Sequence, residues 1–357
     1  MAERLSTRRA TPPGNARPAA GRPGKSRFAL PLDMPAMEAR AADTIPDEPG
    51  LWQYEPKWDG FRCLAFKEGE AVELRAKSGK PLGRYFPDVV SMMRELAAPR
   101  FVLDGEIVIR DGAGLSFEAL QLRLHPAESR VQKLAAETPA QFVVFDLLAS
   151  QDGRSLLDAP LAQRRKALEE FVRQARHERL ILSPCSTALG EAERWLRGSG
   201  SGATDGIVAK LIAEPYRPGE RAMVKVKRLR TADCVVGGFR YLSAGAQVGS
   251  LLLGLYDDDG KLHHVGYTST ISRGDRAALT ARLEALTQPP GFTGRAPGGP
   301  SRWSTERSGD WQPLRPELVV EVCFDHVTDD RFRHGTKFLR WRPDKKPSQC
   351  TFEQIRR

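Results

Sequence analysis

The hydrophobic residues of this chain come in short runs that are separated by turn-forming residues. Runs rich in Val, Ile and Phe cover residues 101–109, 141–148 and 206–212. Runs of this length are typical of buried strands. The chain also contains 32 glycines and 26 prolines, and no run reaches the roughly 18–20 apolar residues that a membrane-spanning helix needs. The pattern therefore predicts a globular protein built on short strands and excludes an integral membrane protein.

The hydrophobic pattern changes near residue 230, and with 357 residues the chain is long enough for two domains. Before this point strands alternate with helical segments, the clearest of which is residues 160–177, where Leu161, Leu168 and Phe171 repeat at helical spacing. After it, strands are predicted at 234–241, 248–256, 262–267 and 317–324, with one helix at 273–288. Short strands with one helix favour a small β-barrel, the oligonucleotide-binding (OB) fold first.

Most of the excess positive charge belongs to the first 27 residues. The chain has a net charge of +10, of which the tail supplies seven basic residues and one acid, a net of +6: Arg4, Arg8, Arg9, Arg17, Arg22, Lys25, Arg27 and Glu3. Without apolar periodicity the tail cannot offset its ordering entropy, so we expect residues 1–27 to be disordered. An Arg-rich, acid-poor tail also suits an organellar presequence, the alternative interpretation.

The five cysteines are scattered, with no CxxC pair and no Cys/His cluster. This spacing argues against a structural zinc site or a disulfide framework and fits a reducing cytoplasm. The glycine-rich stretch 198–202 (GSGSG) lacks the Lys-Ser/Thr ending of a phosphate-binding loop, so we expect an ordinary loop.

Six ordered segments carry the chemistry of the chain. They are Glu55-Pro-Lys-Trp-Asp-Gly-Phe-Arg62, Leu103-Asp-Gly-Glu-Ile-Val108, Phe142-Val-Val-Phe-Asp-Leu-Leu148, Asp205-Gly-Ile-Val-Ala-Lys210, Val224-Lys-Val-Lys227 and Lys337-Phe-Leu-Arg-Trp-Arg-Pro-Asp-Lys345. In order and spacing they resemble the motifs of the covalent nucleotidyltransferases, the superfamily of DNA ligases, RNA ligases and mRNA capping enzymes. The chain is most similar to the compact, two-domain, ATP-dependent bacterial DNA ligases of the C type. This resemblance implies an α/β nucleotidyltransferase (adenylation) domain with antiparallel sheets at 28–229 and an OB-fold β-barrel at 230–357.

The resemblance makes Lys57 the nucleophile that attacks the α-phosphorus of ATP and forms lysyl-AMP. A free lysine with a pKa near 10.4 is mostly protonated at pH 7, a deficit of roughly 4.6 kcal/mol. Burial and neighbouring cations can offset this deficit. Lys225 and Lys227 share one face of a predicted strand and would be those cations, with the α-phosphate as partner; a solvated basic strand edge is the alternative. Asp59 lies in an Asp-Gly turn that would fix the lysine.

The resemblance also implies a set of nucleotide contacts: Glu55, Arg62, Lys77, Glu106, Phe145, Lys210, Arg342 and Lys345. Phe145 would stack on adenine, although a core position explains Phe145 or Phe142 equally well. Lys77 stands where the family has arginine and loses the bidentate fork. Arg342 and Lys345, in the last motif, would orient pyrophosphate after the barrel swings onto ATP.

Two carboxylates, Glu106 and Asp205, would bind the metal. Few carboxylates together with phosphates and water suit Mg²⁺ or Mn²⁺. The second position is usually Glu in the family, and the shorter Asp205 makes a bridging water more plausible there.

We therefore expect an ATP-dependent DNA ligase that seals nicks between a 3′-hydroxyl and a 5′-phosphate through lysyl-AMP and DNA-adenylate, in DNA repair. Basic clusters at 221–230 and 331–346 suit the backbone of nicked double-stranded DNA. We expect a monomer in the bacterial cytoplasm, near the nucleoid and without membrane contact, with other repair proteins as further partners. The alternatives are an RNA ligase, a GTP-using capping enzyme or a catalytically inactive nucleic-acid-binding relative.

Overall fold

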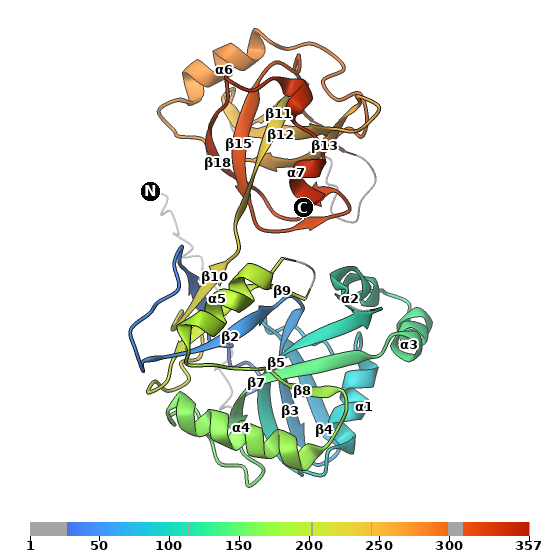
Figure 1. Ribbon diagram of the computed structural model, residues 1–357. Coiled ribbons are helices and arrows are strands. Elements are labelled where there is room, and N and C mark those ends of the chain that lie inside the picture. The colour runs from blue at the N-terminus through green and yellow to red at the C-terminus, as the bar shows by residue number, and fades with distance from the viewer. Residues whose placement is uncertain (1–26, 113, 201–202, 244, 299–309, 357) are drawn as a thin grey trace, which may run out of the picture.

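The computed structural model describes residues 27–112, 114–200, 203–243, 245–298 and 310–356. Figure 1 shows two lobes that are joined by the connection between β10 (Met223–Lys227) and β11 (Arg230–Tyr241). Residues 1–26 of the expected disordered tail lie outside the described residues, as do residues 201–202 of the expected glycine-rich loop. In the described part of the chain, no helix is long and apolar enough to span a membrane.

The first lobe is built on a six-stranded sheet with the order β4-β3-β5-β7-β8, in which β6 pairs with β5. All the pairs are antiparallel except β7 with β8. The strands are β3 (Phe61–Glu68), β4 (Ala71–Ala76), β5 (Arg100–Asp111), β6 (Gly114–Leu115), β7 (Ala140–Ala149) and β8 (Leu180–Leu182). Nine of the ten residues of β7 are buried, because one apolar cluster packs around Phe142 and another around Leu148.

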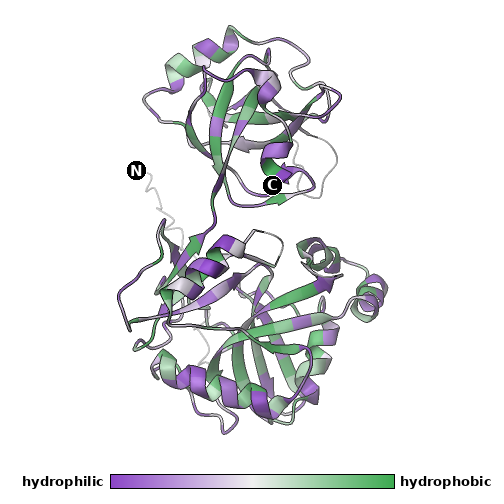
Figure 2. Ribbon diagram, in the orientation of Figure 1, coloured by the Kyte–Doolittle hydropathy of each residue, from purple (hydrophilic) through white to green (hydrophobic). Residues whose placement is uncertain are grey.

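Figure 1 labels the helices of the first lobe. They are α1 (Pro87–Glu95), α2 (Phe117–Arg123), α3 (Glu128–Glu137), α4 (Leu161–Ala175) and α5 (Leu189–Gly198). Helices α1, α2 and α4 contact the six-stranded sheet, whereas α5 packs against the second sheet of this lobe. The helix predicted at 160–177 is confirmed as α4, whose Leu168 and Phe171 are buried in the core. In Figure 2 the apolar residues concentrate in the strands of both lobes, whereas the exposed helices mix polar and apolar residues.

A second, four-stranded sheet carries six charged motif residues: Glu55, Lys57, Asp205, Lys210, Lys225 and Lys227. Its order is β1-β10-β9-β2, with β1 (Ala39–Ala41), β2 (Trp52–Trp58) and β9 (Thr204–Leu211). Gly206 has φ +156, and a Cβ at this position would lie 2.1 Å from the carbonyl oxygen of Val226. Only glycine allows β9 to come this close to β10. The glycine therefore helps to hold Asp205 beside the lysines of β2 and β10.

The second lobe is a curled sheet with the order β13-β12-β11-β15-β18. Its elements are β12 (Val248–Tyr256), β13 (Leu262–Thr268), α6 (Arg276–Glu284), β14 (Gln312–Pro313), β15 (Val319–Phe324), β16 (Val327–Thr328), β17 (Arg331–Phe332), β18 (Lys337–Trp341), the 3₁₀ turn Pro347–Gln349 and α7 (Glu353–Arg356). The four predicted strands are confirmed as β11, β12, β13 and β15, and the predicted helix as the shorter α6.

The two edge strands of this sheet meet at a single parallel bridge between Thr268 and Thr336. The Oγ1 of Thr268 donates a hydrogen bond to the carbonyl of Thr336 at 2.9 Å. No continuous ladder closes the described strands into a full barrel. The arrangement is consistent with the partly open five-stranded OB fold that the sequence predicts.

Candidate active site

A cavity of about 230 Å³ lies where the two sheets of the first lobe meet. It is lined from β2, β3, β5, β7, β9 and β10 and from the segment that precedes β1. Eight of the residues predicted from the motifs line it: Glu55, Lys57, Arg62, Lys77, Glu106, Phe145, Lys210 and Lys225. Segments that are up to about 170 positions apart in the chain thus converge on one hollow.

The amine of Lys57, at the end of β2, forms an ion pair with Asp205. The Nζ lies 2.7 Å from Oδ1 of Asp205, and the side chain of Lys57 is 24% exposed. Asp205 also pairs with Lys227 at 2.9 Å. Burial opposes ionisation of Asp205, but Lys57 and Lys227 outweigh it and lower its pKa. The carboxylate is therefore ionised and holds two amines from different strands.

The two lysines of β10 have different environments. Lys225 lines the cavity, and it forms no ion pair with any carboxylate in the part of the chain described. Burial and the nearby charges of Lys57 and Lys227 lower its pKa. Lys227 does not line the cavity; it pairs with Asp205 and, at 2.7 Å, with Asp325 of the second lobe. Burial opposes its charge, but these carboxylates raise its pKa.

Phe145 forms an aromatic wall of the cavity and is 8% exposed. Two cations lie over its ring: the Nζ of Lys210 at 4.7 Å and the guanidinium carbon of Arg62 at 4.6 Å from the centroid. By contrast, Phe142 is fully buried in the apolar core. Of the two phenylalanines of this motif, only Phe145 is thus available to a ligand.

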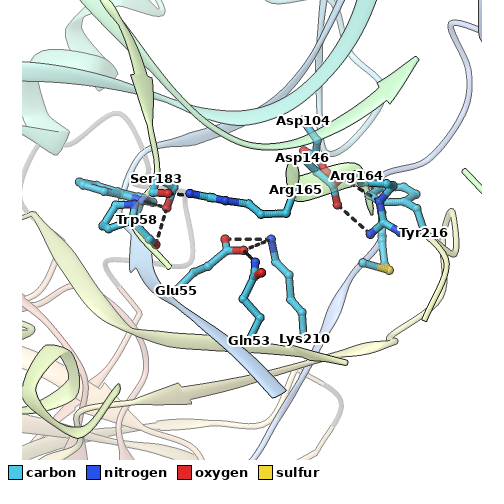
Figure 3. A network of polar contacts seen from close by, with 12 residues as sticks. Gln53, Glu55, Trp58, Asp104, Asp146, Arg164, Arg165, Ser183, Lys210 and Tyr216 are labelled. Atoms are coloured by element: carbon cyan, nitrogen blue, oxygen red, sulfur yellow. Dashed lines mark hydrogen bonds and ion pairs between the residues drawn. The ribbon is translucent and has the colours of Figure 1, made fainter. Parts of the chain in front are cut away.

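Glu55 and Lys210 form a buried ion pair of 2.8 Å beside this ring. Lys210 contacts both oxygens of Glu55, and Gln53 donates a hydrogen bond of 2.8 Å to Oε1 of the same carboxylate. Figure 3 shows these three side chains pointing toward one another, with Arg165 next to them. The group is a fixed polar surface at one end of the cavity.

Arg62 is held by a bidentate ion pair with the fully buried Asp104. Its Nε and Nη2 lie 2.5 and 2.6 Å from the two carboxylate oxygens. Tyr216 donates a hydrogen bond of 2.7 Å to the same carboxylate and accepts one of 2.8 Å from the backbone of Met37. The motif analysis missed Asp104 as the partner of Arg62 and Tyr216 as the partner of Asp104. Asp104 could have been found, because it opens the Asp-Gly-Glu motif.

Glu106 lines this cavity and a second, adjacent one of about 1000 Å³. Burial raises its pKa to about 7, although Arg62 and Lys57 act in the opposite direction. Its Oε1 accepts a hydrogen bond of 3.1 Å from the backbone of Gly60. Among the described residues no group of three or more His, Cys, Asp or Glu side chains could hold a metal alone. A divalent ion here would therefore need phosphate or water oxygens beside Glu106.

Asp59 faces the second lobe and does not line the cavity. It pairs with Arg333, whose guanidinium carbon lies 3.3 Å from the centroid of the Phe117 ring. The neighbouring contact between Lys227 and Asp325 also crosses between the lobes, and His334 lies 3.0 Å from Asp325. Sequence reasoning missed Arg333, Asp325 and His334 as partners. Arg333 falls in the basic cluster 331–346, but its pairing depends on the position of the lobes.

Arg342 and Lys345 are not among the residues that line the cavity. They lie on the second lobe just after β18, where both pair with Asp233. Lys77 reaches the cavity from the turn after β4 and pairs with Glu38 at 3.2 Å. In this arrangement the structure thus gathers the first five motifs and leaves the last motif apart.

Comparison with known proteins matches both lobes. Residues 34–227 match the family described as ATP dependent DNA ligase domain, and residues 244–345 match the ATP dependent DNA ligase C terminal region. The chain is 47% identical over 337 residues to DNA ligase C1 of Mycolicibacterium smegmatis, covering 91% of this chain and 95% of that protein.

Two further similarities are weaker. The chain is 32% identical over 308 residues to the multifunctional non-homologous end joining DNA repair protein LigD of Mycobacterium tuberculosis, covering 85% of this chain and 37% of that protein. A solved structure from a structure-function analysis of Lig E DNA ligases shares the fold, with a TM-score of 0.55 and 17% identity over 86% of this chain and 99% of that one. The two matched regions and the relative with 47% identity show that this chain belongs to the ATP-dependent DNA ligases.

Proposed function

We propose that Lys57 is the nucleophile of a three-step reaction that seals nicks in DNA. The observation that carries the proposal is the cavity that Lys57 lines together with Glu106, the ring of Phe145 and Lys225, which has no carboxylate partner among the described residues. An amine that attacks the α-phosphorus of a nucleotide needs cations beside the phosphate and an acceptor for its own proton. The nucleotide also needs a surface against which its adenine can pack. The described residues supply all three.

In the first step the Nζ of Lys57 attacks the α-phosphorus of ATP. A P–N bond forms, the bond from the α-phosphorus to the bridging oxygen breaks, and pyrophosphate leaves with the electron pair. The amine loses a proton, and Asp205 Oδ1, 2.7 Å away, is positioned to accept it or to pass it to water. Because an ion pair favours the protonated amine, this contact must loosen before attack.

In the two later steps the AMP moves to DNA and then leaves. An oxygen of the 5′-phosphate attacks the phosphorus of lysyl-AMP, the P–N bond breaks, and Lys57 regains its proton. The 3′-hydroxyl then attacks the 5′-phosphate and loses its proton while AMP departs with the electron pair. Lys225, with no carboxylate partner in the described chain, would contact the AMP phosphate throughout; Lys227 and Asp59 would hold the arrangement around it.

The nucleotide would lie with adenine against Phe145. The pair of Glu55 and Lys210 at that end of the cavity offers a charged acceptor and a donor to the base. Arg62 is pre-organised by Asp104 and would contact the ribose or a phosphate. Fixed polar partners of this kind orient a ligand with little further loss of entropy.

A divalent ion, Mg²⁺ or Mn²⁺, would be held by Glu106 with the phosphates, and more remotely by Asp205. The donor set fits: Glu106 is a carboxylate that lines the cavity, accepts a hydrogen bond from a backbone N–H and gains by ionising beside a cation. Such an ion supplies charge stabilisation to the polyphosphate. Asp205 is less available because two lysines already share its oxygens.

The nicked double-stranded DNA would approach along the larger cavity. That cavity shares Arg62, Lys77 and Glu106 with the smaller one and adds the basic side chains of Lys80 and Arg84. Basic side chains in a groove suit a phosphate backbone. Since one relative is named a multifunctional non-homologous end joining DNA repair protein, we propose a role in DNA repair in the bacterial cytoplasm near the nucleoid, with other repair proteins as partners.

We further propose a domain division at residue 229, so that residues 28–229 form the adenylation domain and 230–357 the OB-fold domain. Strand β10 ends at Lys227 and β11 begins at Arg230, which supports a hinge between them. In this structure the OB-fold domain presents Asp325 and Arg333 to the adenylation domain. Arg342 and Lys345 could reach the polyphosphate only after the domain turns.

Sealing of a labelled nicked duplex tests the function. The protein with a divalent ion should seal the nick with ATP and not with GTP, and DNA-adenylate should appear as an intermediate. A nick in an RNA duplex is the comparison substrate. Failure to seal DNA, or sealing confined to RNA, would contradict the proposal.

A further inference from the structure

The last two cations of the final motif share one carboxylate. Asp233 Oδ1 lies 2.7 Å from Nη1 of Arg342, and Oδ2 lies 3.0 Å from Nζ of Lys345. The backbone N–H of Lys345 also donates to the carbonyl of Arg342 at 3.2 Å, which forms a turn that brings the two side chains to the same side. Asp233 is therefore the point on which the two cations converge.

The carboxylate of Asp233 sits at a fixed position in the fold. Asp233 belongs to β11, is 7% exposed and lies opposite Glu321 of β15 in the ladder. The side chain of Gln354 clamps its backbone from both sides, because Oε1 accepts from the N–H at 2.9 Å and Nε2 donates to the carbonyl at 3.0 Å. The residue cannot move without disturbing β11 and the C-terminal helix together.

Arg342 and Lys345 remain open to an anion on their other sides. Their side chains are 17% and 27% exposed, and the second partner of Arg342 is Asp344, which is 63% exposed. Asp344 occupies Nε and Nη2 of Arg342 at 2.9 and 2.8 Å, the edge that a phosphate would take. An exposed carboxylate can swing away, whereas the buried Asp233 stays in place.

We propose that Asp233 is a positioning residue that holds Arg342 and Lys345 together as a two-cation unit for pyrophosphate. Two like charges on long side chains repel each other and sample many rotamers unless a fixed counter-charge gathers them. Asp233 supplies that counter-charge and leaves the outward faces of both cations for the polyphosphate. The inference rests on the proposed function, in which the final motif acts only while pyrophosphate leaves.

The test compares Asp233→Asn with the wild type in two reactions of the full chain. In the first, labelled ATP and Mg²⁺ form the lysyl-AMP adduct, and added pyrophosphate reverses it. In the second, the protein seals a nick that already carries AMP on its 5′-phosphate. Asp233→Asn should slow adduct formation and its reversal by on the order of tenfold to a hundredfold, the effect of slightly misplaced groups. It should seal the pre-adenylated nick at the wild-type rate.

Two further variants serve as controls for this comparison. Glu321→Gln removes another carboxylate beside Arg342, but one that lies 3.9 Å away and is not among the partners of Lys345, so it should slow adduct formation much less. Asp233→Glu keeps the charge and displaces it by one methylene, so it should slow the same reaction by an intermediate factor. It also supplies the answer if Asp233→Asn fails to fold.

Equal loss in both reactions would mean that Asp233 serves folding, and no loss in either would mean that the cations need no anchor. Both results would overturn the inference. The variant Arg342→Ala distinguishes failure of the inference from failure of the proposed function. A slow Arg342→Ala beside a normal Asp233→Asn would overturn only the inference, whereas a normal Arg342→Ala would overturn the proposed role of the final motif and the inference with it.

Discussion

Glu106 stands at the boundary of the two cavities, where burial raises its pKa to about 7. The ordinary pKa of a glutamate is about 4.3, so the unfolded chain ionises this residue before the folded protein does. Ionising the buried Glu106 therefore lowers the stability of the folded protein as pH rises from about 4.5 to about 7. Above this range the free-energy cost is constant. Above pH 7 it approaches roughly 3–4 kcal/mol, since each pKa unit corresponds to 1.36 kcal/mol. The residue is thus suited to receive a positive charge.

Glu106→Gln should therefore make the ligand-free protein more stable than the wild type at pH 8 and equally stable near pH 4. The carboxyl group is protonated in both states at the lower pH, so its ionisation then costs nothing. Denaturant unfolding at the two pH values measures the difference. The same variant should lose nick sealing at every pH. A stability difference that does not change with pH would show that Glu106 is not held in its neutral form.

The strand β7 decides which of its two phenylalanines meets the cavity. Phe142 and Val144 point into the apolar core at the ordinary spacing of two. The pairing with β5 then shifts, because Asp104 faces Asp146 but Gly105 faces Val144. One extra residue, Phe145, lies between them, and such a bulge re-aims a side chain.

This geometry predicts separate effects for the two phenylalanines. Phe145→Ala should weaken ATP binding by about 1–3 kcal/mol through lost stacking, with the fold retained. Phe142→Leu, the matched core variant, should lower the free energy of unfolding and leave ATP affinity unchanged. Nucleotide titration and denaturant unfolding of both variants provide the measurements. Unchanged ATP affinity in folded Phe145→Ala would show that Phe145 has only a structural role.

An element can be predicted from the sequence when its signal lies in its own residues. Strands such as β7 and β12 were predictable because their apolar runs stand between turn residues. The short β16 and β17 have only two residues each, so no periodicity announces them. The bulge at Phe145 was equally invisible, since it is defined by the pairing with another strand.

The same limit applies to the site. Resemblance to a family located Lys57 and seven other residues that line its cavity, because each belongs to a local motif. It did not find the partners Arg333, Asp325 and Asp233, which act through contacts with distant segments. Burial and charge at these positions emerge only when the two lobes and the β11–β18 sheet are assembled.

The two lobes meet through one set of residues while another set stays apart. Asp59 and Lys227 are engaged by Arg333 and Asp325, whereas Arg342 and Lys345 are held on Asp233. If the first set serves the reactions at the nick and the second serves ATP, the OB-fold domain must turn between the steps.

Single variants of the two arginines should therefore fail in opposite reactions. Arg342→Ala should slow adduct formation from ATP severely and still seal a pre-adenylated nick, which needs no triphosphate. Arg333→Ala should form the adduct at a near-normal rate and seal the pre-adenylated nick slowly. Rates on plain and pre-adenylated nicks measure both. If both variants lose the two reactions in the same proportion, the lobes do not exchange faces between steps.

Everything above depends on Lys57 as the residue that carries AMP. The decisive measurement incubates the wild type, Lys57→Ala and Lys57→Arg with labelled ATP and Mg²⁺, followed by denaturing electrophoresis and peptide mapping of the adduct. We expect label on the wild type alone, on the peptide with Lys57, labile to acid and stable to base as a phosphoramidate is. Arginine is too basic to supply a neutral nucleophile, so Lys57→Arg should be as inactive as Lys57→Ala. A labelled adduct on either variant, or on another lysine of the wild type, would contradict the account.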